Sequence, residues 1–180
     1  MRYLLLTALL ALCVFGPARA HDGKHGGFAG AEGSALGHRW DFSLPTLDGS
    51  RFVQAQALRG PVLVNFWGRD CPPCIAELPR LEAFAKANPQ WTVWLVSTDA
   101  PAVAAEFVRR IDLKAQVLRP GSNVVALMRR AGNRHGALPF SVGLREGRIC
   151  RTQLGEIHES DLTHWTADCE TPLTYRRSPS

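Results

Sequence analysis

The stretch of sequence that decides the fold reads Pro61-Val62-Leu63-Val64-Asn65-Phe66-Trp67-Gly68-Arg69-Asp70-Cys71-Pro72-Pro73-Cys74. Its first half, residues 61–67, is a nearly continuous run of β-branched and aromatic side chains, which is typical of a strand buried on both faces of a partly parallel sheet. From Cys71 to about Lys86, apolar residues recur every three positions or so, and this periodicity predicts an amphipathic helix. The sequence therefore predicts a central strand that leads directly into a long helix.

The two cysteines lie at the start of that predicted helix. Two thiols separated by two residues on a first helical turn can close a short disulfide ring. The helix N-terminus also offers unpaired N–H groups and a positive dipole to a thiolate at Cys71. Pro72 and Pro73 give up no helical hydrogen bond at these positions, and they stiffen the ring between Cys71 and Cys74. The pattern predicts a nucleophilic cysteine pair suited to thiol–disulfide exchange.

A metal site is the alternative interpretation of this spacing, because C-x-x-C is also half of a zinc tetrathiolate site. No second C-x-x-C follows, and Cys150 and Cys169 are isolated from each other. The histidines near the N-terminus, His21, His25 and His38, share no spacing that would hold a metal ion on a helix or strand. We therefore expect redox chemistry, with no metal site and no cofactor.

Residues 1–20 have the pattern of a secretory signal, with Arg2 before a short apolar run at residues 4–15 and small residues up to Ala20. The apolar run is too short to span a bilayer as a helix, so we expect a soluble protein in the periplasm or otherwise exported. Lipidation at Cys13 is a weaker alternative. Signal removal would leave four cysteines in a compartment where disulfides persist.

The length of 180 residues predicts one domain. Residues 21–38 have almost no large apolar side chains and are expected to form a flexible leader. A folded domain is expected at residues 39–168, followed by a polar tail at residues 169–180. The domain opens with an alternating segment at residues 40–45 and a return strand at 52–53, which predicts an N-terminal β-hairpin.

The rest of the domain alternates strand and helix patterns. Strands are expected at residues 91–97, 139–144 and 149–154, and helices at residues 100–111, 124–130 and 159–167. A βαβ half followed by a hairpin and a closing helix is an α/β fold with a central mixed sheet flanked by helices. The net charge of +5 comes from scattered basic residues, so we expect no nucleic-acid partner.

A resemblance joins these features. In order and spacing, the chain resembles the TlpA/ResA-type branch of the thioredoxin-like superfamily over roughly residues 40–168, through Asp41-Phe42, Val64-Asn65-Phe66-Trp67, Cys71-Pro72-Pro73-Cys74, Glu77-Leu78-Pro79, Val96-Ser97-Thr98-Asp99 and Leu138-Pro139. The resemblance implies a thioredoxin-like fold and a protein-disulfide oxidoreductase. It also implies that Cys71 attacks a substrate disulfide and that Cys74 resolves the mixed disulfide.

Further roles follow from the resemblance. Pro139 matches a cis-proline that lies across from the redox pair and, with Leu138, shapes the groove for the partner's backbone. Glu77, one helical turn after Cys74, matches an acidic residue that exchanges a proton with that cysteine; a plain solvated helix glutamate is the alternative. Trp67 matches a tryptophan that packs beside the site.

One position departs from the family pattern. Asp70 stands directly before Cys71, where relatives usually have tryptophan, and that position usually lines the contact surface. A carboxylate there opposes thiolate formation, and Arg69 offsets this effect. Neither the thiol acidity nor the redox potential is therefore carried over from the family. We expect the substrate groove to contain Trp67, Asp70, Pro72, Pro73 and Leu138.

The remaining cysteines, Cys150 and Cys169, have three interpretations. We favour a structural disulfide over two free thiols or a relay to Cys71, because the protein is predicted to be exported. A bridge that closes a loop of about 20 residues would stabilise the fold by roughly 3 kcal/mol in the chain-entropy model.

The function predicted from the resemblance is reduction of disulfides in client proteins, for example in cytochrome c or copper-protein assembly. The partners expected are client protein disulfides or thiols and a membrane electron-donor protein that recharges the pair, and the chain is expected to be a monomer. A copper-binding chaperone that uses Cys71 and Cys74 is the alternative. A peroxidase is disfavoured because the T-x-x-C setting is absent.

Overall fold

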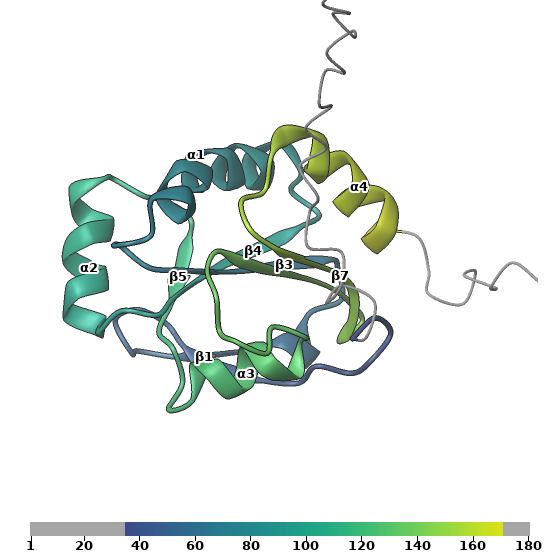
Figure 1. Cartoon of the computed structure of the whole chain (residues 1–180), viewed down its shortest axis with the longest axis horizontal. Helices are drawn as coiled ribbons and strands as arrows, with labels where there is room; N and C mark the ends of the chain where they lie inside the picture. The colour runs from purple at the N-terminus through teal and green to yellow at the C-terminus, as the bar shows by residue number, and fades with distance from the viewer. Residues whose placement is uncertain (1–34, 171–180) are drawn as a thin grey trace, which may run out of the picture.

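A five-stranded mixed sheet forms the centre of the structure, a computed structural model that describes residues 35–170 (Figure 1). Its strands are β3 (Val62–Trp67), β4 (Thr92–Ser97), β5 (Gln116–Leu118), β6 (Phe140–Arg145) and β7 (Arg148–Leu154). Their order across the sheet is β5-β4-β3-β6-β7. Strands β3, β4 and β5 are parallel, whereas β6 and β7 are antiparallel to their neighbours. The predicted α/β class with a mixed sheet is confirmed.

Helices cover both faces of this sheet. The helices are α1 (Pro72–Ala87), α2 (Pro101–Arg110), α3 (Val124–Arg130) and α4 (Glu159–Glu170). Helices α1 and α4 lie together over one face, and α3 lies over the opposite face beside the N-terminal hairpin (Figure 1). Two apolar cores result, one on each side of the sheet.

Strand β3 is buried along its whole length, as the apolar run predicts. Val64 and Phe66 belong to the core that faces α3, whereas Leu63 and Trp67 belong to the core that faces α1. The alternation follows from the two-residue period of a strand, which sends successive side chains to opposite faces. Because β3 is central and is followed immediately by α1, the two cysteines lie at the edge of the sheet where β3 ends.

The N-terminal hairpin consists of β1 (Ser43–Pro45) and β2 (Phe52–Gln54), which pair antiparallel and are followed by a short 3-10 helix, Ala55–Ala57. Trp40, just before the hairpin, is almost fully buried, and its Nε1–H donates to the carbonyl of Leu127 in α3 across 3.1 Å. The predicted hairpin is confirmed, although β1 is shorter than the alternating segment at residues 40–45.

Two boundaries differ from those expected. Residues 35–38, which the composition places in the leader, pack on β7: Ala35 is buried, and the N–H of Gly37 donates to the carbonyl of Ile149 across 2.7 Å. Main-chain hydrogen bonds hold this segment without large side chains, which is why composition missed it. At the other end, α4 runs to Glu170, so Cys169 lies inside the helix rather than after it.

Strand β5 has no counterpart among the predicted elements. It contains three residues, which is too short for a periodic pattern to show. The predicted signal at residues 1–20, most of the leader and the tail at residues 171–180 lie outside the described residues. None of the helices within residues 35–170 is long and apolar enough to cross a lipid bilayer.

Candidate redox site

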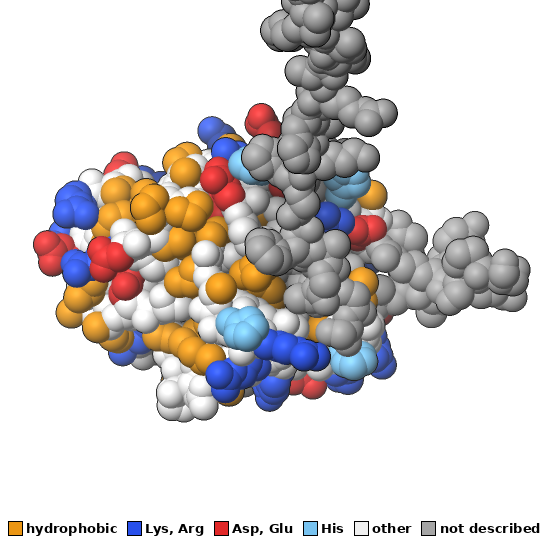
Figure 2. All heavy atoms as spheres, in the orientation of Figure 1, with side chains coloured by type: hydrophobic (Ala, Val, Ile, Leu, Met, Phe, Trp, Pro, Cys, Tyr) orange, Lys and Arg blue, Asp and Glu red, His pale blue; other side chains and the backbone are white. Residues whose placement is uncertain are grey.

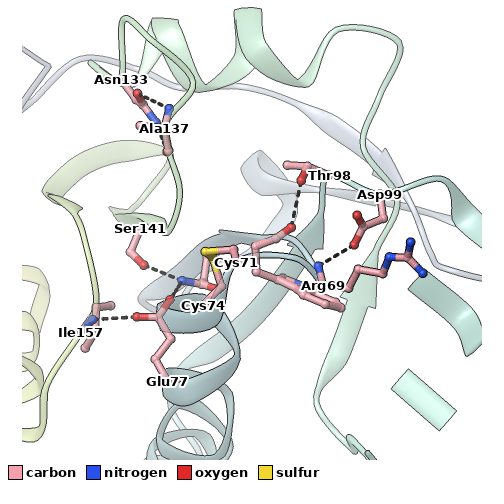
Figure 3. Close-up of a disulfide and its surroundings, with 12 residues drawn as sticks. Arg69, Cys71, Cys74, Glu77, Thr98, Asp99, Asn133, Ala137, Ser141 and Ile157 are labelled. Atoms are coloured by element: carbon pink, nitrogen blue, oxygen red, sulfur yellow. Dashed lines mark hydrogen bonds between the residues drawn. A yellow bond between two sulfur atoms is a disulfide. The ribbon is translucent and has the colours of Figure 1, made fainter. Parts of the chain in front are cut away.

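Cys71 and Cys74 form a disulfide at the N-terminus of α1, with the two sulfur atoms 2.06 Å apart (Figure 3). Cys71 is the N-cap residue, and Pro72 and Pro73 are the first helical residues, so no helical hydrogen bond is lost to them. Cys71 is partly exposed, whereas Cys74 is fully buried. A partner molecule can therefore reach only the first sulfur of the pair.

The loop before Cys71 is held by the end of the neighbouring strand β4. Asp99 accepts a hydrogen bond from the N–H of Arg69 across 2.9 Å (Figure 3). The hydroxyl of Ser97 also donates to this carboxylate at 3.3 Å. Thr98 donates both its N–H and its hydroxyl to the carbonyl of Trp67. These bonds fix the turn that carries the chain from β3 into α1.

Asp70 points into solvent, with 85% of its side chain exposed, and pairs with the guanidinium of Arg69 at 3.4 Å. The cation beside the carboxylate partly compensates its charge, as the sequence suggests. An ion pair this exposed is weak, because water screens both groups. Asp70, Pro72 and Pro73 together form the exposed rim around the first cysteine.

Glu77 lies one turn after Cys74 and is fully buried under the redox pair. Its Oε1 accepts a hydrogen bond from the side-chain amide of Asn65 across 2.6 Å, and its Oε2 accepts one from the N–H of Ile157 across 2.6 Å. The same amide nitrogen of Asn65 donates to the hydroxyl of Ser141 across 2.9 Å (Figure 3). The carboxylate is therefore held between β3, α1 and the β7–α4 loop, and it is not a solvated helix glutamate.

Burial raises the pKa of Glu77 from 4.5 to about 7, because a charged carboxylate is disfavoured away from water. The hydrogen bonds from Ile157 and Asn65 oppose this shift but do not cancel it. A carboxyl group with a pKa near neutrality takes up and releases a proton under physiological conditions.

The peptide bond between Leu138 and Pro139 is cis, as the resemblance implies. Leu138 packs against the core that contains Cys74, and it faces Gly68, where an added Cβ would lie 3.6 Å from its Cδ1. Pro139 directly precedes β6, and Phe140 at the start of β6 pairs with Phe66 near the end of β3. Trp67 is buried against Phe107 of α2, with ring centroids 5.7 Å apart.

The other two cysteines form a second disulfide between β7 and α4. Cys150 and Cys169 are joined over 1.99 Å and are both buried, so neither sulfur is accessible to a partner or to Cys71 by exchange through solvent. Gly143 of β6 makes room for this bridge, because a Cβ there would lie 2.7 Å from the sulfur of Cys169. The expected structural bridge is present.

The structure thus brings the predicted residues Cys71, Cys74 and Glu77 together with the Leu138–Pro139 segment. Sequence reasoning missed the partners of Glu77, namely Asn65 and the N–H of Ile157. Asn65 carried a signal, because it is the one amide within the apolar run of β3 and a buried polar side chain needs a partner. A backbone N–H leaves no such signal in the sequence.

No group of three or more His, Cys, Asp or Glu side chains within residues 35–170 is arranged to hold a metal ion. Any soft metal ion bound at this end of the described chain would have the two thiolates of Cys71 and Cys74 as its protein ligands.

Comparison with known proteins agrees with this architecture. The chain is 34% identical over 92 residues to the soluble secreted antigen MPT53 of Mycobacterium tuberculosis, and this match spans 51% of the chain and 53% of MPT53, about half the relative's length. It is 26% identical over 165 residues to the thiol-disulfide oxidoreductase ResA of Bacillus cereus, covering 88% of the chain and 92% of ResA.

Among solved structures, a secreted disulfide oxidoreductase of Mycobacterium tuberculosis superposes with a TM-score of 0.57 at 26% identity, covering 70% of this chain and 94% of that one. The family model described as the AhpC/TSA family matches residues 37–143, which is more than half of the chain. With its thioredoxin-like sheet and its C-x-x-C pair on the first helix, the chain belongs to the AhpC/TSA family.

Proposed function

We propose that the protein is an exported thiol–disulfide oxidoreductase that reduces disulfides in client proteins through Cys71 and Cys74. The observation that carries the proposal is the asymmetry of the pair at the α1 N-terminus: Cys71 is partly exposed and Cys74 is buried beside Glu77. ResA and the solved Mycobacterium tuberculosis relative are both disulfide oxidoreductases by name, and this supports the same reaction class.

In the reduced protein, the thiolate of Cys71 attacks one sulfur of a client disulfide and releases the other client sulfur as a thiolate. Cys74 then loses its proton and attacks the sulfur of Cys71 in the mixed disulfide. The second client thiol leaves, and the Cys71–Cys74 disulfide forms. Two electrons pass from the pair to the client, and no cofactor takes part.

Glu77 supplies the proton acceptor for the second step. Cys74 is buried, so water cannot take its proton, whereas the carboxylate of Glu77 lies one turn further along the same helix with a pKa of about 7. Asn65 and Ile157 hold this carboxylate in place through the hydrogen bonds to its two oxygens. The groove formed by Leu138 and Pro139 would receive the client backbone beside Cys71.

A reductase must be reduced again after each turnover. We propose that a membrane protein donates these electrons, because the oxidised pair has no other source of reductant in an oxidising compartment. Clients in cytochrome c or copper-protein assembly fit a reductant of this kind.

The test is to reduce the full chain and mix it with a protein disulfide such as insulin, comparing the wild type with Cys71→Ser and Cys74→Ser. We expect Cys74→Ser to accumulate a mixed disulfide through Cys71, since the resolving thiol is gone. Cys71→Ser should form none. A Cys71→Ser variant that reduces insulin as fast as the wild type would refute the assignment.

Copper carriage by the same thiols is distinguished by titrating the reduced chain with Cu(I). If the protein is a copper carrier, Cys71→Ala combined with Cys74→Ala should abolish tight Cu(I) binding while insulin reduction by the wild type stays negligible. Rapid insulin reduction by the wild type together with unchanged Cu(I) affinity in the double variant would exclude the carrier.

A further inference from the structure

A side-chain clamp holds the segment that precedes Leu138. Asn133 is 97% buried, and its carboxamide bonds both polar backbone groups of Ala137. Its Oδ1 accepts from the N–H of Ala137 across 3.1 Å, and its Nδ2 donates to the carbonyl of Ala137 across 2.8 Å (Figure 3). A carboxamide used in this way replaces the two hydrogen bonds that a neighbouring strand would make.

The clamp is itself anchored to the core. The N–H of Asn133 donates to the carbonyl of Met128 across 3.0 Å, at the end of α3. Gly136, inside the loop that the clamp closes, has a φ of 67°, a left-handed conformation that favours glycine. The loop is therefore shaped around Asn133 and does not depend on contacts with a partner.

Leu138 follows this clamp directly, and its own backbone is free. Within residues 35–170, neither its N–H nor its carbonyl takes part in a hydrogen bond, whereas Ala137 before it and Pro139 after it are both bonded. The side chain of Leu138 packs against the core that contains Cys74. A free donor and a free acceptor are thus held in fixed position on a segment whose side chain packs against the core of the redox pair.

We propose that Asn133 is a positioning residue for protein clients: it holds the Leu138 backbone as a preformed edge on which an extended segment of the client pairs. This inference rests on the proposed function. That the client backbone lies along Leu138 and Pro139 is implied by the resemblance; the inference concerns Asn133 as the residue that orders this segment before an extended client segment binds.

The physical reason is preorganisation. If Asn133 did not bind Ala137, the loop from 133 to 138 would have to be ordered each time a client bound, and that ordering would oppose binding. The N–H and carbonyl of Ala137 would also be left unpaired or would compete for the client's groups. A small disulfide has no extended backbone to pair, so its reaction with Cys71 does not depend on this edge.

The test compares two substrates for the full chain: insulin under turnover, with dithiothreitol recharging the pair, and the small disulfide dithiobis-nitrobenzoate, mixed with pre-reduced protein from which dithiothreitol has been removed. For Asn133→Ala we expect the KM for insulin to rise about tenfold, equivalent to roughly 1.4 kcal/mol, with kcat little changed. The rate with the small disulfide should change by less than about twofold. Asn133→Asp has the same size but lacks the amide donor, and it should show the same selective rise if Asn133→Ala does not fold.

Asn123→Ala is the matched control, because Asn123 caps α3 by accepting from the N–H of Ala126 and makes no hydrogen bond to residues 133–138. It should lose comparable stability without a selective change in KM. Equal losses on both substrates in the Asn133 variants, or an unchanged KM for insulin, would overturn the proposal. Failure of the proposed function is distinguishable, because the wild type itself would then not reduce insulin.

Discussion

The N–H of Ile157 donates a hydrogen bond to Oε2 of Glu77 across 2.6 Å, although 80 positions separate the two residues in the chain. Ile157 lies in the loop between β7 and α4. Arg80, three residues after Glu77 on α1, also contacts this loop, because its guanidinium donates to the carboxylate of Glu156 across 3.2 Å. The buried acid of the redox site is thus held by the C-terminal part of the domain. The consequences for stability and for exchange can be measured separately.

The stability of the oxidised protein should depend on the titration of Glu77. Its pKa is raised in the folded state from 4.5 to about 7, so the folded protein holds the proton more tightly than the unfolded chain does. Stability is therefore highest below the unfolded value and falls as the pH rises toward the folded value. Relative to Glu77→Gln, the wild type should lose on the order of 3 kcal/mol in its free energy of unfolding across this window.

Urea unfolding of both proteins from about pH 4 to about pH 8.5 checks this expectation. The same substitution at Glu106, an exposed residue of α2, controls for the loss of one negative charge. A difference between wild type and Glu77→Gln that stays constant over the whole range would contradict the burial argument.

The rate at which Cys74 resolves the mixed disulfide should depend on the protonation state of Glu77. Above about pH 7 the carboxylate of Glu77 can accept the proton of Cys74, whereas below it the carboxyl group already holds a proton. Glu77→Gln should slow resolution by about tenfold or more at neutral pH, because general-base assistance is lost. Stopped-flow measurements of mixed-disulfide decay should also lose the inflection near neutrality, and a retained inflection would assign it to another group.

Removing the second disulfide should weaken the fold without stopping exchange. In the variant that combines Cys150→Ala with Cys169→Ala, we expect the free energy of unfolding to fall by roughly 3 kcal/mol, because the bridge no longer restricts the unfolded chain. Insulin reduction below the unfolding transition should persist. A complete loss of turnover in a folded variant would show instead that this bridge takes part in electron transfer.

Gly143→Ala tests the packing around the same bridge. A Cβ at this position would lie 2.7 Å from the sulfur of Cys169 and 3.1 Å from that of Cys150, so we expect a loss of about 2 kcal/mol from overpacking. In the protein that lacks both sulfurs the same substitution should cost much less. A double-mutant cycle measured by urea unfolding gives this coupling directly, and strict additivity would mean that the sulfurs are not what excludes the methyl group.

Asp70→Asn tests the effect of the aspartate that stands before Cys71 in place of the family's usual tryptophan. Neutralising this carboxylate should favour the thiolate and raise the rate at which iodoacetamide alkylates the reduced protein, by less than about tenfold because Asp70 is 85% exposed. Asp112→Asn, at an exposed site far along the chain, is the control. A rate that does not rise would indicate that Arg69 already neutralises Asp70.

The sequence alone determined the central strand, the helix that follows it and the redox pair between them. Each of these depends on residues close together in the chain: the apolar run of residues 61–67, the three-residue periodicity after Cys71, and a two-residue spacing with prolines at the first helical positions. Strand β5 was not predicted, because three residues are too few to show a two-residue periodicity. The packing of residues 35–38 on β7 was not predicted, because backbone hydrogen bonds rather than large side chains hold this segment.

Only the tertiary structure decided the chemistry around that pair. Burial of Glu77, which the sequence left open between a proton acceptor and a solvated residue, depends on Asn65 from one strand and Ile157 from a loop 80 positions away. The clamp of Asn133 on Ala137 likewise arises from how the loop closes against α3. Periodicity reports which face of an element is buried, but hydrogen bonds between distant elements form only when the sheet brings them together.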